Sequence, residues 1–113
     1  MKIISLILFS LGMAFNAISD TLAHHFSTSV FRNLDPQWWN PDISWINKTT
    51  MFTQTSDAWH LSKTLMLISF IFSIIFYKPL TKIKSPLLSK AVDFLIIGVT
   101  GIIVFNIFYD WIL

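Results

Sequence analysis

The sequence predicts an all-α integral membrane protein with three transmembrane helices and a tryptophan-rich outer interfacial loop containing short helices. Hydrophobic residues make up 54% of the 113 residues and charged residues only 12%, about half the charged share of soluble domains. The mean hydropathy is +0.64. The apolar residues gather in three stretches, 3–23, 59–77 and 91–113. Each is long enough to cross a hydrocarbon core of about 30 Å as a helix.

These stretches occupy most of the chain, so we expect residues 1–113 to form a single membrane domain, with connecting loops at 26–58 and 78–90. A core of three helices is thin, which favours assembly into a homo-oligomer or a larger membrane complex. The chain has no cysteine, which excludes disulfides, thiolate metal sites and cysteine nucleophiles. The net charge of +2 is too small to indicate a nucleic-acid partner.

The first stretch has two interpretations. It could be a secretory signal, because small residues lie along it, at Ala14, Ala17 and Ala23. Against this, the apolar run is long, and no clear small-x-small cleavage pattern precedes a polar start. Asn16, Asp20 and His24 also recur at the four-residue interval of one helix face. We therefore expect the stretch to be retained as a transmembrane helix.

The loop 26–58 shows two helix starts. In Asp35-Pro36 and Asn40-Pro41 a capping residue precedes proline, which predicts short helices at 36–39 and 41–47. The loop also carries amphipathic rings of the kind found at headgroup depth, Trp38, Trp39 and Trp45. We expect the loop to cover the ends of the helices at the outer leaflet, either as an aromatic anchor alone or as a lid that contacts substrate.

The second and third stretches have their own start signals. Ser56 can cap the second, with Asp57 in its first turn, and Ser85-Pro86 predicts that the third helix begins at 86. Both stretches carry small residues at helical spacing, Ser69 and Ser73 on one and Gly98 and Gly101 on the other. Small faces let helices approach closely in lipid, so these two helices are expected to form a close antiparallel hairpin.

The distribution of lysines between the two connecting loops predicts the membrane topology. The connection between the second and third stretches carries Lys78, Lys82, Lys84 and Lys90, whereas the loop 26–58 carries only Arg32 and Lys48. The positive-inside rule then places the amino terminus and the loop 78–90 in the cytoplasm. It places the tryptophan-rich loop and the carboxyl terminus outside a cell membrane that the chain crosses three times. Asp93, near the inner end of the third helix, is expected to pair with Lys90 or with another lysine of this loop, with a proton or ion relay as the alternative.

Ionisable residues gather at the outer end of each predicted helix. Alternating helix directions bring these ends together, so we expect one polar site at the outer membrane boundary. Imidazoles and carboxylates suit a divalent metal ion (zinc, iron or manganese), and the expected ligands are Asp20, His24, Asp57 and His60. The residues expected to act as acid, base or substrate contact are His25, Lys63 and Asp110.

A metal-bound water is acidified toward pH 7 and can attack an ester or phosphoryl group. The first functional hypothesis is therefore a metal-assisted hydrolase or transferase acting on a membrane lipid or lipid-like substrate. The alternative is an oligomeric ion channel or transporter subunit, in which the same residues form a hydrated polar belt, or an accessory subunit of a larger complex. The sequence contains no compact metal motif such as His-Glu-x-x-His and no phosphate-binding loop, so it leaves open whether the chain is an enzyme.

Overall fold

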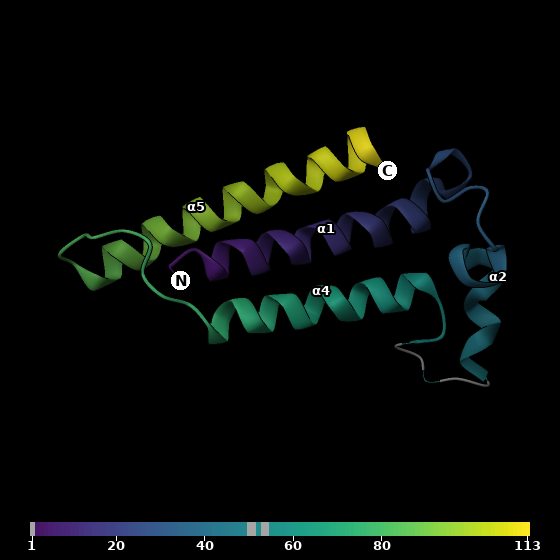
Figure 1. The fold of residues 1–113 in the computed structure, drawn as a ribbon, viewed down its shortest axis with the longest axis horizontal. Helices are drawn as coiled ribbons and strands as arrows, with labels where there is room; N and C mark the ends of the chain where they lie inside the picture. Colours follow the sequence, from purple (N-terminus) through teal and green to yellow (C-terminus); the bar gives the residue numbers. More distant parts are fainter. Residues whose placement is uncertain (1, 50–51, 53–54) are drawn as a thin grey trace.

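The computed structural model describes residues 2–49, 52 and 55–113, and the regular secondary structure among them is helical, with no strand. Three long helices lie side by side (Figure 1): α1 (Ile4–His25), α4 (Ala58–Ile75) and α5 (Pro86–Asn106). Helix α4 runs antiparallel to α1 and α5. The shorter elements are η1 (Phe26–Thr28), α2 (Pro36–Trp39), α3 (Pro41–Ser44), η2 (Trp45–Thr49) and η4 (Ile107–Ile112), the last a π-helical continuation of α5.

The three long helices are long and apolar enough to cross a membrane. Their buried positions are held mostly by small or polar residues, such as Gly12, Ala17 and Ser69. Large apolar side chains lie outside instead: Ile74 is 77% exposed, Leu87 80% and Phe94 75%. A soluble protein buries its large apolar side chains, whereas small residues between helices and large ones outside are typical of helices packed in lipid.

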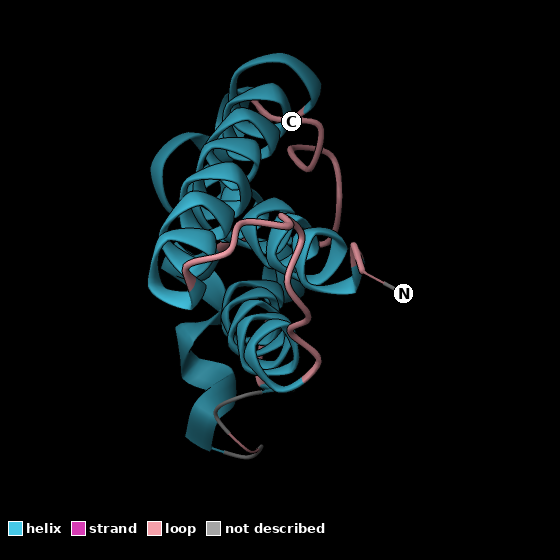
Figure 2. Ribbon diagram, turned by 90° about the vertical axis from the view of Figure 1, so that its left-hand side faces the viewer, coloured by secondary structure: helices cyan, strands magenta, loops and turns pink. Residues whose placement is uncertain are grey.

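Helix α1 is the centre of the bundle. It packs along both α4 and α5, while α4 and α5 make almost no contact with each other over the described residues. Figure 2 shows the helices end-on, with the connection between α4 and α5 crossing over that end of the bundle. The expected close hairpin of α4 and α5 is therefore wrong.

The small residues do mediate close packing, but against α1. Ser5 and Ser73 join α1 to α4 by two reciprocal bonds, in which each hydroxyl donates to the other residue's carbonyl oxygen, at 2.8 and 2.9 Å. Gly12 of α1 lies under the ring of Phe70, and Gly101 of α5 lies against the ring of Phe9. The sequence-based pairing failed because α1 lies between the other two helices: its small residues Ser5 and Gly12 pack against α4, and its Phe9 ring packs against Gly101 of α5.

The helix starts largely follow the sequence. Helices α2, α3 and α5 begin at Pro36, Pro41 and Pro86, as predicted, and are capped by the side chains of Asp35, Asn40 and Ser85. The second predicted helix of the loop is shorter than expected, since α3 ends at Ser44 and the chain continues as the 3-10 helix η2. The cap of α4 is Asp57 and not Ser56, so that prediction was one residue off.

Asp93 of α5 is buried, and its carboxylate holds the connection between α4 and α5 in place by hydrogen bonds. It accepts hydrogen bonds from the Tyr77 hydroxyl, from Leu80 N at 3.0 Å, and from Thr81 N and Oγ1 at 3.1 and 2.9 Å. The expected pairing with Lys90 is therefore wrong, because the connection folds back over α5 and supplies nearer donors. A buried carboxylate satisfied in this way fixes the backbone around it.

The two ends of the chain lie at opposite ends of the bundle (Figure 1). The amino terminus lies at the end of the bundle that carries the connection between α4 and α5. The carboxyl terminus lies beside the end of α1, where Val30 N donates to the carbonyl oxygen of Leu113 at 3.0 Å. The end of α1, the start of α4 and the segment η4 therefore share one end of the bundle with α2 and α3, and this end carries the predicted site residues.

Candidate functional site

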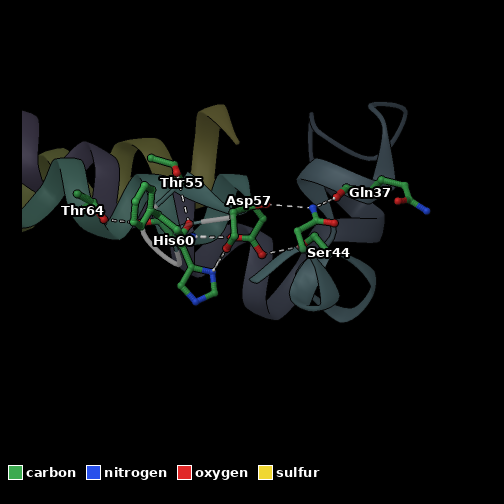
Figure 3. A network of polar contacts seen from close by, with 9 residues as sticks. Gln37, Ser44, Thr55, Asp57, His60 and Thr64 are labelled. Carbon is green, nitrogen blue, oxygen red and sulfur yellow. Dashed lines mark hydrogen bonds and ion pairs between the residues drawn. The ribbon is translucent and has the colours of Figure 1, made fainter. Parts of the chain in front are cut away.

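The centre of the site is the pair formed by Asp57 and His60 at the start of α4 (Figure 3). Oδ1 of Asp57 accepts a hydrogen bond from the main-chain N–H of His60 at 2.8 Å and lies 2.7 Å from Nδ1 of the same residue. Oδ2 accepts from the hydroxyl of Ser44 at 2.6 Å. The Asp57 side chain is only 1% exposed, so both of its oxygens are committed inside the protein.

Two opposing effects act on the pKa of Asp57. Burial disfavours the charged form and raises the pKa, but the hydrogen bonds from Ser44 and from the main chain and ring of His60 favour it more, and the net pKa is lowered. Asp57 is therefore a carboxylate at neutral pH and can only accept hydrogen bonds. Nδ1 of His60 must then carry the proton between them, which leaves Nε2 with the lone pair whenever the ring is neutral.

Nε2 of His60 is turned away from Asp57 in Figure 3. The His60 side chain is 27% exposed, and no described residue forms a hydrogen bond with Nε2. The Trp59 ring packs edge-on against the imidazole, with centroids 4.8 Å apart. A histidine with one nitrogen held by a buried carboxylate and the other open is arranged to accept a proton or bind a metal ion.

Hydrogen bonds join the tryptophan-rich loop to the pair and to the residue before it. Ser44, which donates to Asp57, is the last residue of α3. The amide nitrogen of Asn47 donates to the carbonyl oxygens of Gln37 at 2.7 Å and Ser56 at 3.0 Å. Sequence reasoning missed Ser44 and Asn47 as parts of the site, because nothing in the local pattern reveals a contact with a residue nine or thirteen positions away.

Lys63 forms a second polar group on α4, one turn deeper than His60. Its Nζ donates to Oδ1 of Asn16 at 3.0 Å and lies 3.6 Å from Oδ1 of Asp20, both on α1. The same Nζ lies 5.8 Å from the centre of the Trp59 ring. The stripe of Asn16 and Asp20 read from the sequence thus faces α4. About a third of the Lys63 and Asp20 side chains is exposed, so solvent or headgroups reach this pair.

The other predicted residues lie around these two groups. His24 is exposed in the last turn of α1, and Asp110 is exposed on η4. His25 packs edge-on against Tyr109, with ring centroids 4.7 Å apart. The structure therefore joins Asp57 to His60 and Asp20 to Lys63, while the described residues contain no group of three or more histidine, cysteine or acidic side chains that could hold a metal ion. The four-ligand metal site stays a prediction.

The chain was compared with known protein families, with curated proteins and with solved structures, and none of these comparisons found a match. An assignment of function therefore rests on the geometry of the site.

Proposed function

We propose that the chain is a membrane-bound hydrolase or transferase that acts on the polar part of a lipid-like substrate at the outer membrane boundary. The observation that carries this proposal is the buried carboxylate of Asp57, 2.7 Å from Nδ1 of His60. A carboxylate in this position fixes the tautomer of the ring and stabilises the imidazolium that forms when the other nitrogen takes a proton. His60 is the base, and Asp57 is the residue that positions it.

In the proposed reaction, Nε2 of His60 removes a proton from water or from a substrate hydroxyl. The deprotonated oxygen attacks an ester carbonyl or phosphoryl group, and the imidazolium returns the proton to the leaving oxygen. Lys63, three residues further along α4, supplies a positive charge for the anionic transition state. Its ammonium has three N–H groups, and one of them donates to Asn16, so donors remain for a substrate.

A divalent metal ion is compatible with the same geometry. Histidines that bind metals commonly donate their second ring N–H to a carboxylate, which is the relationship of His60 to Asp57. His60 Nε2 would be the first ligand; Asp20 and His24, the further ligands expected from the sequence, do not form a three-residue metal-binding group with it among the described residues. Asp57 would support His60 without binding the ion, because both of its oxygens are already committed. When bound, the ion would supply an acidified water for the attack.

The proposed orientation places this site outside the cell membrane. Three lysines, Lys78, Lys82 and Lys84, lie in the connection between α4 and α5 at the opposite end of the bundle, and Lys90 lies near the start of α5. Short loops rich in lysine stay in the cytoplasm. The tryptophan-rich loop then covers the site at the outer leaflet, where the hydrogen bonds of Ser44 and Asn47 hold it against α4.

The test uses the purified chain in vesicles of phosphatidylethanolamine and phosphatidylglycerol, with the lipids followed over time by mass spectrometry. The wild type is expected to convert one of the lipids, and His60→Gln to lower the rate at least about 100-fold. Asp42→Asn is the matched control, since Asp42 is an exposed aspartate of α3 that is not a member of the pair. A wild type that converts neither lipid, or an unchanged rate in His60→Gln, would contradict the proposal.

Elemental analysis of the same preparations separates the two forms of the mechanism. Stoichiometric zinc, iron or manganese that is lost in His60→Gln supports the metal-assisted form. Activity in protein that holds no stoichiometric metal supports His60 acting as a base alone.

A second candidate function is a channel or transporter subunit, and one observation favours it. Lys63, Asp20 and Asn16 place charged and amide groups between α1 and α4, inside helices that are apolar enough to span a membrane. Such groups often mark an ion path. A cation or anion flux across vesicles that Lys63→Met abolishes, with no change in the lipids, would favour this function.

A further inference from the structure

The end of the bundle opposite the candidate site contains an apolar cavity between α4 and α5, with α1 as its floor. Its volume is about 670 Å³, within the range of about 300–1,000 Å³ typical of small-molecule sites. Its walls are mainly aromatic and aliphatic, with Phe70 from α4 and Phe94 and Ile97 from α5. We propose that this cavity binds an acyl chain of an anionic phospholipid, with the lipid headgroup held against Lys90.

The two serine hydroxyls of the cavity floor already donate their protons within the protein. Ser5 and Ser73 each donate their hydroxyl to the other's carbonyl oxygen. Gly98 widens the cavity, because a Cβ added there would meet no atom within 4 Å. A mainly apolar lining whose serine hydroxyl protons are already donated suits a hydrocarbon chain. The separation of α4 from α5 leaves this interior accessible from between the two helices.

The charges around the cavity select an anionic headgroup. Lys90 lines the cavity, and the adjoining connection carries three more lysines, Lys78, Lys82 and Lys84. The acidic residue of this end, Asp93, is buried and committed to Tyr77 and to the connection. Asp93 keeps its negative charge, but one carboxylate does not balance four lysines, and the described residues of this end contain no second one. A phosphate group is attracted to such a surface, whereas a zwitterionic headgroup gains much less.

The proposal is tested by native mass spectrometry of the full chain in detergent, with phosphatidylglycerol and phosphatidylcholine of identical acyl chains. One phosphatidylglycerol is expected to bind per chain, several-fold more tightly than phosphatidylcholine. Lys90→Gln should weaken phosphatidylglycerol binding about fivefold and leave phosphatidylcholine binding unchanged. Gly98→Leu should remove the binding of both lipids, because the new side chain fills the cavity.

Lys90→Gln and Gly98→Leu each have a matched control variant. Lys84→Gln removes an exposed lysine that does not line the cavity, and should weaken phosphatidylglycerol binding less than twofold. Val99→Leu enlarges an exposed residue next to Gly98 that does not line the cavity either, and should leave binding intact. The proposal is overturned if the two lipids bind equally, if Lys84→Gln weakens binding as much as Lys90→Gln, or if Gly98→Leu binds lipid like the wild type. Lys90 is exposed, so its variant remains informative even if Gly98→Leu folds poorly.

Discussion

The carboxylate of Asp57 caps α4 and orients the ring of His60 through the same oxygen. Oδ1 lies 2.8 Å from the main-chain nitrogen of His60 and 2.7 Å from its Nδ1. The start of the helix and the direction of the ring are therefore set together. Asparagine is as good a helix cap as aspartate but carries no charge. Asp57→Asn thus keeps the helix start and removes the negative charge that attracts Nδ1–H of the imidazole.

The lowered pKa of Asp57 predicts a loss of stability in acid. The folded state binds the Asp57 proton less readily than the unfolded state, where an aspartate has a pKa of about 3.9. The stabilising contribution is therefore fully present above about pH 4 and is lost as the pH falls through the lowered folded-state value. The melting temperature of the wild type in detergent should fall more steeply below about pH 4 than that of Asp57→Asn.

An exposed carboxylate provides the comparison for this experiment. Asp42→Asn replaces an exposed aspartate and leaves Asp57 and His60 in place, so its melting temperature should follow the wild-type curve with pH. If Asp57→Asn and Asp42→Asn change the acid dependence equally, Asp57 has no special contribution to stability.

The glycines of the bundle are expected to differ sharply in their tolerance of a side chain. A Cβ at Gly12 would lie 2.5 Å from the Phe70 ring and 3.3 Å from the Met66 carbonyl oxygen, whereas one at Gly98 would meet nothing within 4 Å. Gly12→Leu should lower the free energy of unfolding by about 1–3 kcal/mol. Gly98→Leu should leave it unchanged or raise it slightly, because leucine favours a helix over glycine. Thermal melts in one detergent compare the two, and equal losses would place Gly98 in a packed interface.

The lysine pattern predicts that the two ends of the chain face different compartments. Reporter fusions after Lys84 and after Leu113 should report the cytoplasm and the outside, respectively, because the lysine-rich connection is retained inside. The two ends of the bundle that carry these fusion points are opposite each other (Figure 1). Reporters active in the same compartment would rule out a three-span topology.

Local sequence rules were sufficient to predict where three of the helices start. The cap-proline pairs at Asp35, Asn40 and Ser85 act within one turn, so the starts of α2, α3 and α5 could be read from the sequence. Which helices pack against one another could not be read from the sequence. Gly101 packs on α1 and not on α4, and only the three-dimensional arrangement reveals that α1 lies between the other two helices.

In the site, too, a contact within one helix could be predicted from the sequence, and contacts between separate elements could not. Asp57 and His60 are three residues apart on one helix, so their contact follows from helix geometry. The ion pair of Lys63 and Asp20 joins two helices, and residue spacing along one helix does not predict such a contact. The hydroxyl of Ser44 reaches Asp57 across a loop. Its role depends on how that loop folds, and no spacing rule could give it.

The most direct test of the account is the tautomer of His60. The purified chain, labelled with nitrogen-15 histidine, is studied in detergent by NMR at about pH 8.5, where unperturbed imidazoles are neutral. The account predicts that His60 carries its proton on Nδ1, donated to Asp57, with Nε2 unprotonated, and that Asp57→Asn loses this preference. His60→Gln assigns the signal. A wild-type His60 with its proton on Nε2, or a tautomer that Asp57→Asn does not change, would contradict the claim that Asp57 prepares His60 as a base.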